Sequence, residues 1–247
     1  MTQRLIDSHW CSVLKALIVF HRGIDQVGPG YASRVADLNL SLASFNDPSE
    51  KGAAHSRMIQ EYYAYVKAKA HNHSRRNSAL LAPQAERAKF FSKLDGNELV
   101  REIGYLNNQL ACLVKIGPTA DLALRNYNLK VTQNAVGFIL KDGAPLYRTL
   151  DLGISQLIEG FGMIDPDSIE VAIDHYKKFE QNTNTLKKFF QLGSMLSNAV
   201  GIAPPKFTQR SREVLASLSS YAGDVNPELA VSLSDVKMSK EELEMQK

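Results

Sequence analysis

The chain has 247 residues, 44% of them hydrophobic, and a formal net charge of +3. A chain of this length can bury a substantial core without disulfides, and its two cysteines both lie in apolar helical patterns, as reduced thiols do. No uninterrupted apolar run approaches the roughly 20 residues that span a bilayer. Polar residues interrupt any signal-peptide core near the start of the chain. These features exclude a disulfide-stapled secreted domain and predict a soluble, cytoplasmic protein.

The first predicted helix begins almost at the start of the chain. Its apolar residues recur at the spacing of one helix face, at positions Trp10, Val13, Leu14, Leu17, Ile18 and Ile24. Asp7 or Ser8 can serve as its N-cap. The Gly28-Pro29-Gly30 sequence is expected to end it.

The rest of the chain shows further amphipathic patterns and no alternation typical of a β-strand. The predicted helices cover residues 31–45, 53–71, 97–116, 120–142, 144–161, about 167–200 and 207–221. The segments 120–142 and 144–161 are either two helices or one long bent helix. Gly117-Pro118 is expected to end one helix and start the next. Residues 71–94 are expected to form a polar, basic connection. The fold class is therefore all-α, with short loops that imply antiparallel neighbours.

The basic connection and the lysines just before it contain seven cations and one acid between positions 67 and 93. Such a segment attracts phosphate-bearing partners, either lipid headgroups or nucleic acid, although a solvated loop explains the same run. Three tyrosines between positions 62 and 65 precede it, and an aromatic–basic mixture can bind single-stranded nucleic acid by stacking. Core packing explains the same tyrosine spacing, and we expect no nucleic-acid partner.

No arrangement of residues typical of catalysis or metal binding is found in the sequence. His71 and His73 could offer two metal ligands, but no cysteine or acid lies nearby at ligand spacing, which favours exposed loop histidines. His21 lies among apolar residues, which favours a core histidine held by a hydrogen bond over a catalytic base. The motifs of nucleophilic hydrolases, phosphate-binding loops and zinc proteases are missing. We therefore predict a non-enzyme without a metal or cofactor.

The first helix also contains a longer pattern, Trp10-x-x-x-Leu14-Lys15-x-Leu17-Ile18-x-x-His21-Arg22. This pattern resembles the signature of the ANTH domain, the N-terminal domain of the AP180 and CALM clathrin-assembly proteins. Weaker matches follow in the same order at residues 44–47, 62–66, 126–127, 140–142, 146–147, 153–157, 172–179 and 204–205. Together they cover roughly residues 10–222.

The resemblance implies an α-solenoid of antiparallel helical hairpins over residues 1–222, followed by an acidic, flexible tail at 223–247. It implies an adaptor domain, peripheral at clathrin-coated pits and vesicles, that is recruited by phosphatidylinositol 4,5-bisphosphate and contacts clathrin and AP-2. An alternative function is a protein-interaction module that binds an R-SNARE helix in an apolar groove.

The sequence departs from the family at the lipid site. The family's lysine-rich phosphoinositide motif comes before the tryptophan helix, and only Met1 to His9 precede Trp10 in this sequence. The usual motif therefore has no counterpart, and we expect lipid binding to be weakened or lost in a chain shortened at its N-terminus. The remaining weak candidates for a basic membrane surface are Arg75, Arg76, Arg87 and Lys89.

Two positions can be matched to the family's groove for a SNARE helix. Ile158 keeps the apolar character of its position, whereas Thr183 stands where a larger apolar residue is expected. The tail contains no clathrin box and none of the short motifs that bind AP-2. These two residues are therefore the groove candidates.

The first helix should be an interior helix of the family fold, with neighbours on both sides. Because its upstream neighbours are missing from the sequence, we expect Trp10 to be more exposed than in a complete domain, or to be covered by another chain.

Overall fold

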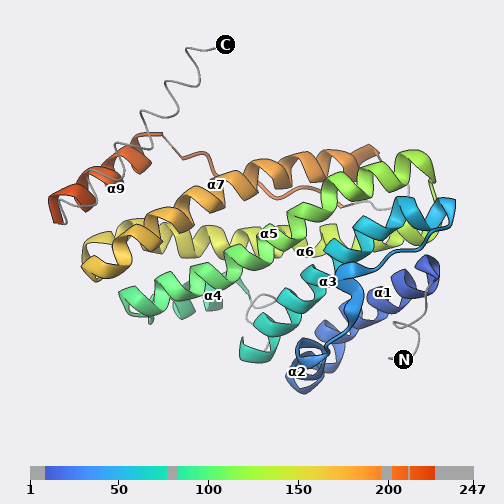
Figure 1. Cartoon of the computed structure of the whole chain (residues 1–247). Helices are drawn as coiled ribbons and strands as arrows, with labels where there is room; N and C mark the ends of the chain where they lie inside the picture. Colours follow the sequence, from blue (N-terminus) through green and yellow to red (C-terminus); the bar gives the residue numbers. More distant parts are fainter. Residues whose placement is uncertain (1–8, 77–82, 196–201, 211, 226–247) are drawn as a thin grey trace, which may run out of the picture.

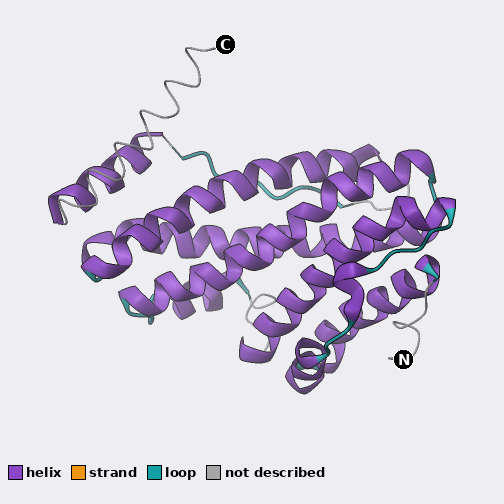
Figure 2. Ribbon diagram, viewed as in Figure 1, coloured by secondary structure: helices purple, strands orange, loops and turns teal. Residues whose placement is uncertain are grey.

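The computed structural model describes residues 9–76, 83–195, 202–210 and 212–225. Within these ranges every regular element is a helix, as Figure 2 shows, and the predicted all-α class is confirmed. No helix in the described part combines the length and the apolar character that a bilayer crossing requires. Most of the acidic segment, residues 226–247, lies outside the described residues.

The helices, labelled as in Figure 1, are α1 (Trp10–Val27), α2 (Pro29–Asp37), α3 (Glu50–Arg76), α4 (Gln84–Phe91), α5 (Gly96–Asn126), α6 (Lys130–Glu159), α7 (Pro166–Met195) and α9 (Arg212–Val225). Two short 3₁₀ turns, Ser41–Ser44 and Phe161–Met163, lie between them.

The long helices form two layers. In one layer α3, α5 and α7 pack side by side in chain order. In the other, α1 packs against α3 and α6, and α6 also packs against α5 and α7. Leucine, isoleucine, valine and aromatic side chains of both layers fill one continuous core.

The start of α1 is capped from a distance and not by a neighbouring side chain. His9 is the N-cap residue and makes no side-chain cap, and the predicted caps Asp7 and Ser8 lie outside the described residues. Instead, the backbone N–H of Trp10 donates to Oδ2 of Asp47 at 2.9 Å. The turn before α3 thereby satisfies one of the free N–H groups at the N-terminus of α1.

Trp10 is buried by its own chain, with only 6% of its surface exposed. Its ring stacks on the imidazole of His55 in α3, with 4.1 Å between the ring centroids. The expectation of an exposed or partner-covered Trp10 is therefore wrong. The reason is that α3 runs across the start of α1 and covers the indole, so no upstream helix is needed for its burial.

The predicted helix over 31–45 is interrupted, because side chains of α3 take over its backbone hydrogen bonds. The hydroxyl of Tyr63 donates to the carbonyl of Leu38 and accepts from the N–H of Leu40, both at 3.1 Å. Lys67 Nζ donates to the same Leu38 carbonyl at 2.8 Å. Because their hydrogen bonds are made by side chains, these backbone groups can leave the helix without being left unpaired.

The predicted break at Gly117-Pro118 does not occur, because α5 continues through Pro118 to Asn126. Pro118 removes one helical hydrogen bond, but Ile116 and Ala120 beside it are fully buried and hold the helix in place. The chain turns instead at residues 127–129. Tertiary packing has overridden the local breaker signal.

The predicted connection over 71–94 is also largely helical. α3 extends to Arg76, and α4 lies inside the same stretch. His73 is consequently buried on α3, although the sequence favoured an exposed loop histidine.

Candidate functional site

Asp142 of α6 lies at the centre of a largely buried group of polar side chains, which we call the Asp142 cluster. Its Oδ2 accepts hydrogen bonds from His21 Nε2 at 2.7 Å, from Lys69 Nζ at 2.7 Å and from the Tyr65 hydroxyl at 2.5 Å. His21 belongs to α1, and Lys69 and Tyr65 belong to α3. The cluster therefore connects three helices that are far apart in the sequence.

Two further contacts complete the cluster. Lys69 Nζ also lies 2.6 Å from Oδ2 of Asp25, so its ammonium group is shared by two carboxylates. His21 Nδ1 forms a 2.8 Å hydrogen bond with the Tyr62 hydroxyl. The prediction that His21 is a core histidine held by hydrogen bonds is confirmed.

The pKa values of the cluster reflect this pairing. Burial alone would raise the pKa of Asp142, but its electrostatic contacts and hydrogen bonds with His21 and Lys69 hold it well below the usual range. Burial and the negative charge of Asp142 raise the pKa values of Tyr62 and Tyr65 well above normal. Asp142 is therefore a carboxylate and both tyrosines are neutral at neutral pH.

Part of the Asp142 cluster has the spacing of a cation site. Among the described residues, His21, Asp25 and Asp142 are the group whose possible ligand atoms all lie within 4.8 Å of one another. Lys69 Nζ already contacts both of these carboxylates. Because an ammonium group supplies the positive charge there, the geometry fits an internal ion-pair network and leaves no position for a metal ion.

The apolar surroundings of His21 in the sequence predicted its burial, but its charged partners were not predicted. Lys69 was the one clue in the sequence to a buried charged partner. It lies seven residues after Tyr62 and four after Tyr65, on the same inner face of its helix. A lysine on an apolar helix face indicates a buried partner, but the sequence does not name a partner 73 residues away.

The four cations predicted as a membrane surface have different environments. Arg87 is buried, and its Nη1 donates to Oγ1 of Thr149 at 2.6 Å. Burial and the nearby charge of Arg148 lower its pKa. Arg87 therefore serves the packing of α4 on α6 and is not a surface cation.

Of the other three cations, the two whose side chains are described are exposed. Lys89 is exposed on α4. Arg75 is exposed near the end of α3, with its guanidinium 3.6 Å from the centroid of the Tyr105 ring. Arg76 ends α3, but its side chain lies outside the described part of the molecule. The basic run is thus divided between structural and exposed positions.

The two groove candidates, Ile158 of α6 and Thr183 of α7, lie far apart along the length of these two helices. Phe179, four residues before Thr183, stacks on Tyr147 of α6 with 5.7 Å between the ring centroids. Ile158 lies eleven residues beyond Tyr147, or about 16 Å along the helix at 1.5 Å per residue. Thr183 is buried and its Oγ1 has no hydrogen-bond partner, whereas Ile158 is half-buried. Only an elongated partner could contact both.

Residues 202–210, which we call the strap, lie against α6 between Tyr147 and Ile158. The N–H of Thr208 donates to the Tyr147 hydroxyl, and its Oγ1 donates to Asp151, both at 2.8 Å. Arg210 forms a 2.6 Å ion pair with Asp151 and donates to Ser155 at 2.9 Å. The strap is therefore held both by the Asp151 carboxylate and by Phe207, whose ring centroid lies 4.9 Å from that of Tyr147.

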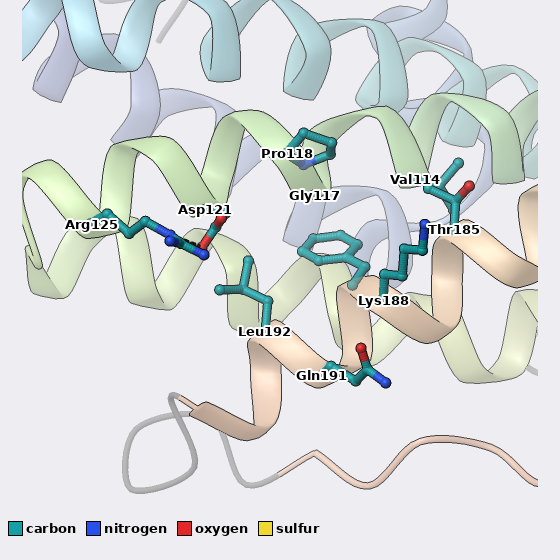
Figure 3. Close-up of a pocket in the computed structure, with 10 residues that line it drawn as sticks. Val114, Gly117, Pro118, Asp121, Arg125, Thr185, Lys188, Gln191 and Leu192 are labelled. Carbon is teal, nitrogen blue, oxygen red and sulfur yellow. Dashed lines mark hydrogen bonds and ion pairs between the residues drawn. The ribbon is translucent and has the colours of Figure 1, made fainter. Parts of the chain in front are cut away.

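A groove runs along the outer side of α5 and α7 and is also bordered by Arg57 and Glu61 of α3. It consists of two adjoining pockets, of about 320 Å³ and 550 Å³, which share Val114, Pro118 and Thr185. We call it the α5–α7 groove, and Figure 3 shows the part nearer the end of α7. No residue of this groove was predicted as a site from the sequence.

Two packed layers of helices, an internal ion-pair network and a surface groove define a helical interaction domain. The chain belongs to the ANTH domain family, whose model matches residues 1–224. The predicted family is thus confirmed.

The chain is similar to several clathrin assembly proteins. It is 24% identical to clathrin coat assembly protein AP180B of Saccharomyces cerevisiae over 228 residues, which cover 88% of this chain and 38% of that protein. It is 23% identical to a putative clathrin assembly protein of Arabidopsis thaliana over 227 residues, which cover 86% of this chain and 39% of that protein. The chain therefore spans about two fifths of the length of these relatives.

Proposed function

We propose that this chain is an adaptor domain that associates peripherally with clathrin-coated pits and vesicles, where it contacts phosphoinositide lipids, clathrin and AP-2. The observation that carries this proposal is the match to the ANTH domain over residues 1–224, together with relatives named as clathrin assembly proteins. The two-layer helical fold supports it, because such a scaffold offers several faces to different partners.

Arg75, Arg76 and Lys89 are the cations proposed to face the membrane. Arg75 and Lys89 are exposed, and Arg87 is set aside because its guanidinium is bonded to Thr149. Each cation near an anionic surface contributes about 1 kcal/mol. Three such residues could therefore hold the domain at a phosphoinositide surface without a dedicated headgroup pocket.

Replacing these three residues by glutamine should weaken binding to vesicles that contain phosphatidylinositol 4,5-bisphosphate by about 100-fold, from the loss of roughly 3 kcal/mol. Co-sedimentation with such vesicles measures the effect. The matched control replaces the exposed lysines Lys15, Lys130 and Lys206, which removes the same charge elsewhere. Binding of the parent chain that does not rise with the lipid would refute direct recruitment, and equal losses in both variants would refute this location.

A second candidate function is the capture of an R-SNARE helix along α6 and α7, between Ile158 and Thr183. The favouring observation is that the strap already occupies this stretch, through the Asp151 carboxylate and the contact of Phe207 with Tyr147. An apolar helix that replaced the strap would cover both candidate residues.

Ile158→Ser should lower the affinity for an R-SNARE peptide by about 10- to 30-fold, because the apolar contact of a half-buried side chain would be lost. Arg210→Ala should raise the affinity, since it removes the ion pair that holds the strap over α6. Calorimetric titration measures both. An Ile158→Ser variant that binds as tightly as the parent would exclude this groove.

A further inference from the structure

We propose that the α5–α7 groove binds an acidic amphipathic helix of another protein, whose apolar stripe is bordered by carboxylates on both sides. This site is separate from the membrane-facing cations and from the stretch of α6 and α7 between Ile158 and Thr183. Its features are an apolar floor, a proline inside α5, and lysines on both walls.

The floor of the groove is apolar. It is formed by Val114, Gly117 and Pro118 of α5 and by Phe189 and Leu192 of α7. A Cβ added at Gly117 would lie only 3.2 Å from the Phe189 ring, so glycine permits the close approach of the two helices at this point. The groove is thus shallow at Gly117 and can accept side chains of a partner from outside.

Pro118 changes the backbone of the floor. Its nitrogen carries no hydrogen, so the carbonyl of Val114 lacks its usual donor four residues further along the helix. Val114 and Pro118 both line the two pockets of the groove. The proline ring thereby adds to the apolar surface that a partner would cover.

The charges of the groove leave an excess of positive potential. Its two acids are neutralised within their own helices, Asp121 by Arg125 at 2.9 Å and Glu61 by Arg57 at 2.5 Å. Figure 3 shows the first of these pairs at one end of the floor.

Among the described residues, two lysines of the groove make no ion pair. Lys115 of α5 and Lys188 of α7 are exposed on opposite walls, and neither has an ion pair within the described residues. Charge complementarity then requires a partner with carboxylates on both sides of its apolar contact surface.

The length of the groove favours a helix as the bound element. Its lining residues on α5 run from Ala111 to Arg125, which is about 21 Å of helix at 1.5 Å per residue. A helix of four turns would place three or four apolar side chains along such a floor. A single extended side chain or a small anion would leave most of the apolar surface uncovered.

The proposal can be tested with a synthetic 16-residue helical peptide that carries leucines along one face and glutamates on both borders of that face. A second peptide has lysines in place of the glutamates. The full chain should bind the glutamate peptide measurably in fluorescence anisotropy and should bind the lysine peptide at least tenfold more weakly. The variant Lys115→Glu/Lys188→Glu should reverse this preference.

The matched control is Lys130→Glu/Lys206→Glu, which makes the same charge change at exposed positions outside the groove. It should leave the preference for the glutamate peptide unchanged, and circular dichroism should show that both variants stay folded. No binding by the parent chain, or a preference that the groove variant does not alter, would overturn the proposal.

Other occupants of the groove give distinct outcomes. If peptide binding appears only after Glu241, Glu242 and Glu244 are replaced by lysine in the full chain, the groove takes the acidic end of its own chain and the proposal is wrong. If the parent chain forms dimers in sedimentation that the groove variant abolishes, the groove takes a second copy and the proposal is equally wrong. Neither outcome bears on the phosphoinositide experiment, so the two proposals stand or fall separately.

Discussion

Replacing Asp142 by alanine should lower the free energy of unfolding by about 3–5 kcal/mol, the usual cost of removing one partner of a buried ion pair. The substitution leaves the Lys69 ammonium buried, with Asp25 as its remaining partner. It also leaves His21 and Tyr65 without their acceptor. Urea unfolding followed by circular dichroism measures the loss.

A double variant separates the cost of an unpaired charge from the net value of the network. Lys69→Met combined with Asp142→Leu removes both charges and replaces them with apolar side chains of similar size. This variant should be more stable than Asp142→Ala, because no buried charge is left alone. Asp25→Asn is the control, since the Asp25 side chain is 30% exposed and its loss should cost less. An Asp142→Ala variant as stable as the parent would show that the network contributes nothing.

The same network sets the behaviour of the domain in acid. The pKa of Asp142 is held below its usual value in the folded state, so its contribution to stability is fully present above the unfolded pKa of about 4. As the pH falls below that value, the unfolded chain takes up a proton that the folded chain resists, and stability decreases. The stability of the Asp142→Ala variant should depend less on pH between 4 and 2.

The fold could be predicted where neighbours in the sequence decide the structure. The apolar stripe of α1 predicted its face correctly, because Val13, Leu14 and Leu17 point into the core. Pro118 misled the prediction, because the local rule for proline takes no account of the buried residues on either side of it. Helix boundaries that depend on packing across the fold cannot be found by local rules.

The candidate sites show the same limit more strongly. Lys69 and Asp142 lie 73 residues apart, and nothing near either one identifies the other. Arg87 belongs to a basic run in the sequence, yet its guanidinium bonds to Thr149, 62 residues away. The α5–α7 groove joins residues of two helices whose facing sides depend on how those helices pack. A sequence can identify candidate residues by their type, but the partners that surround each residue are known only from the fold.

Trp10→Ala should lower the free energy of unfolding by about 3–5 kcal/mol, which is typical of removing a large buried aromatic side chain. The indole fills the space between the start of α1 and His55 of α3, and its loss leaves a cavity that two long helices cannot easily close. Val19→Ala is the control on the same helix, because Val19 is 42% exposed, and it should change stability by less than about 0.5 kcal/mol.

The parent chain offers a direct check of this burial, because Trp10 is its single tryptophan. Its fluorescence should be shielded from acrylamide in the folded state and should shift to longer wavelength on unfolding. Fluorescence that acrylamide quenches as readily in the folded chain as in urea would contradict the burial of Trp10 by α3.

The contact between Trp10 and His55 should also weaken in mild acid. Burial lowers the pKa of His55 more than its hydrogen bond to the Lys51 carbonyl raises it. The unfolded chain therefore binds a proton more readily than the folded chain, so stability falls as the pH drops below the unfolded value of about 6.5. The neutral ring donates through Nδ1 to Lys51 and accepts at Nε2 from Thr132, an arrangement that protonation would break. His55→Gln should reduce the loss of stability between pH 7 and 5, and an unchanged loss would show that His55 is not its source.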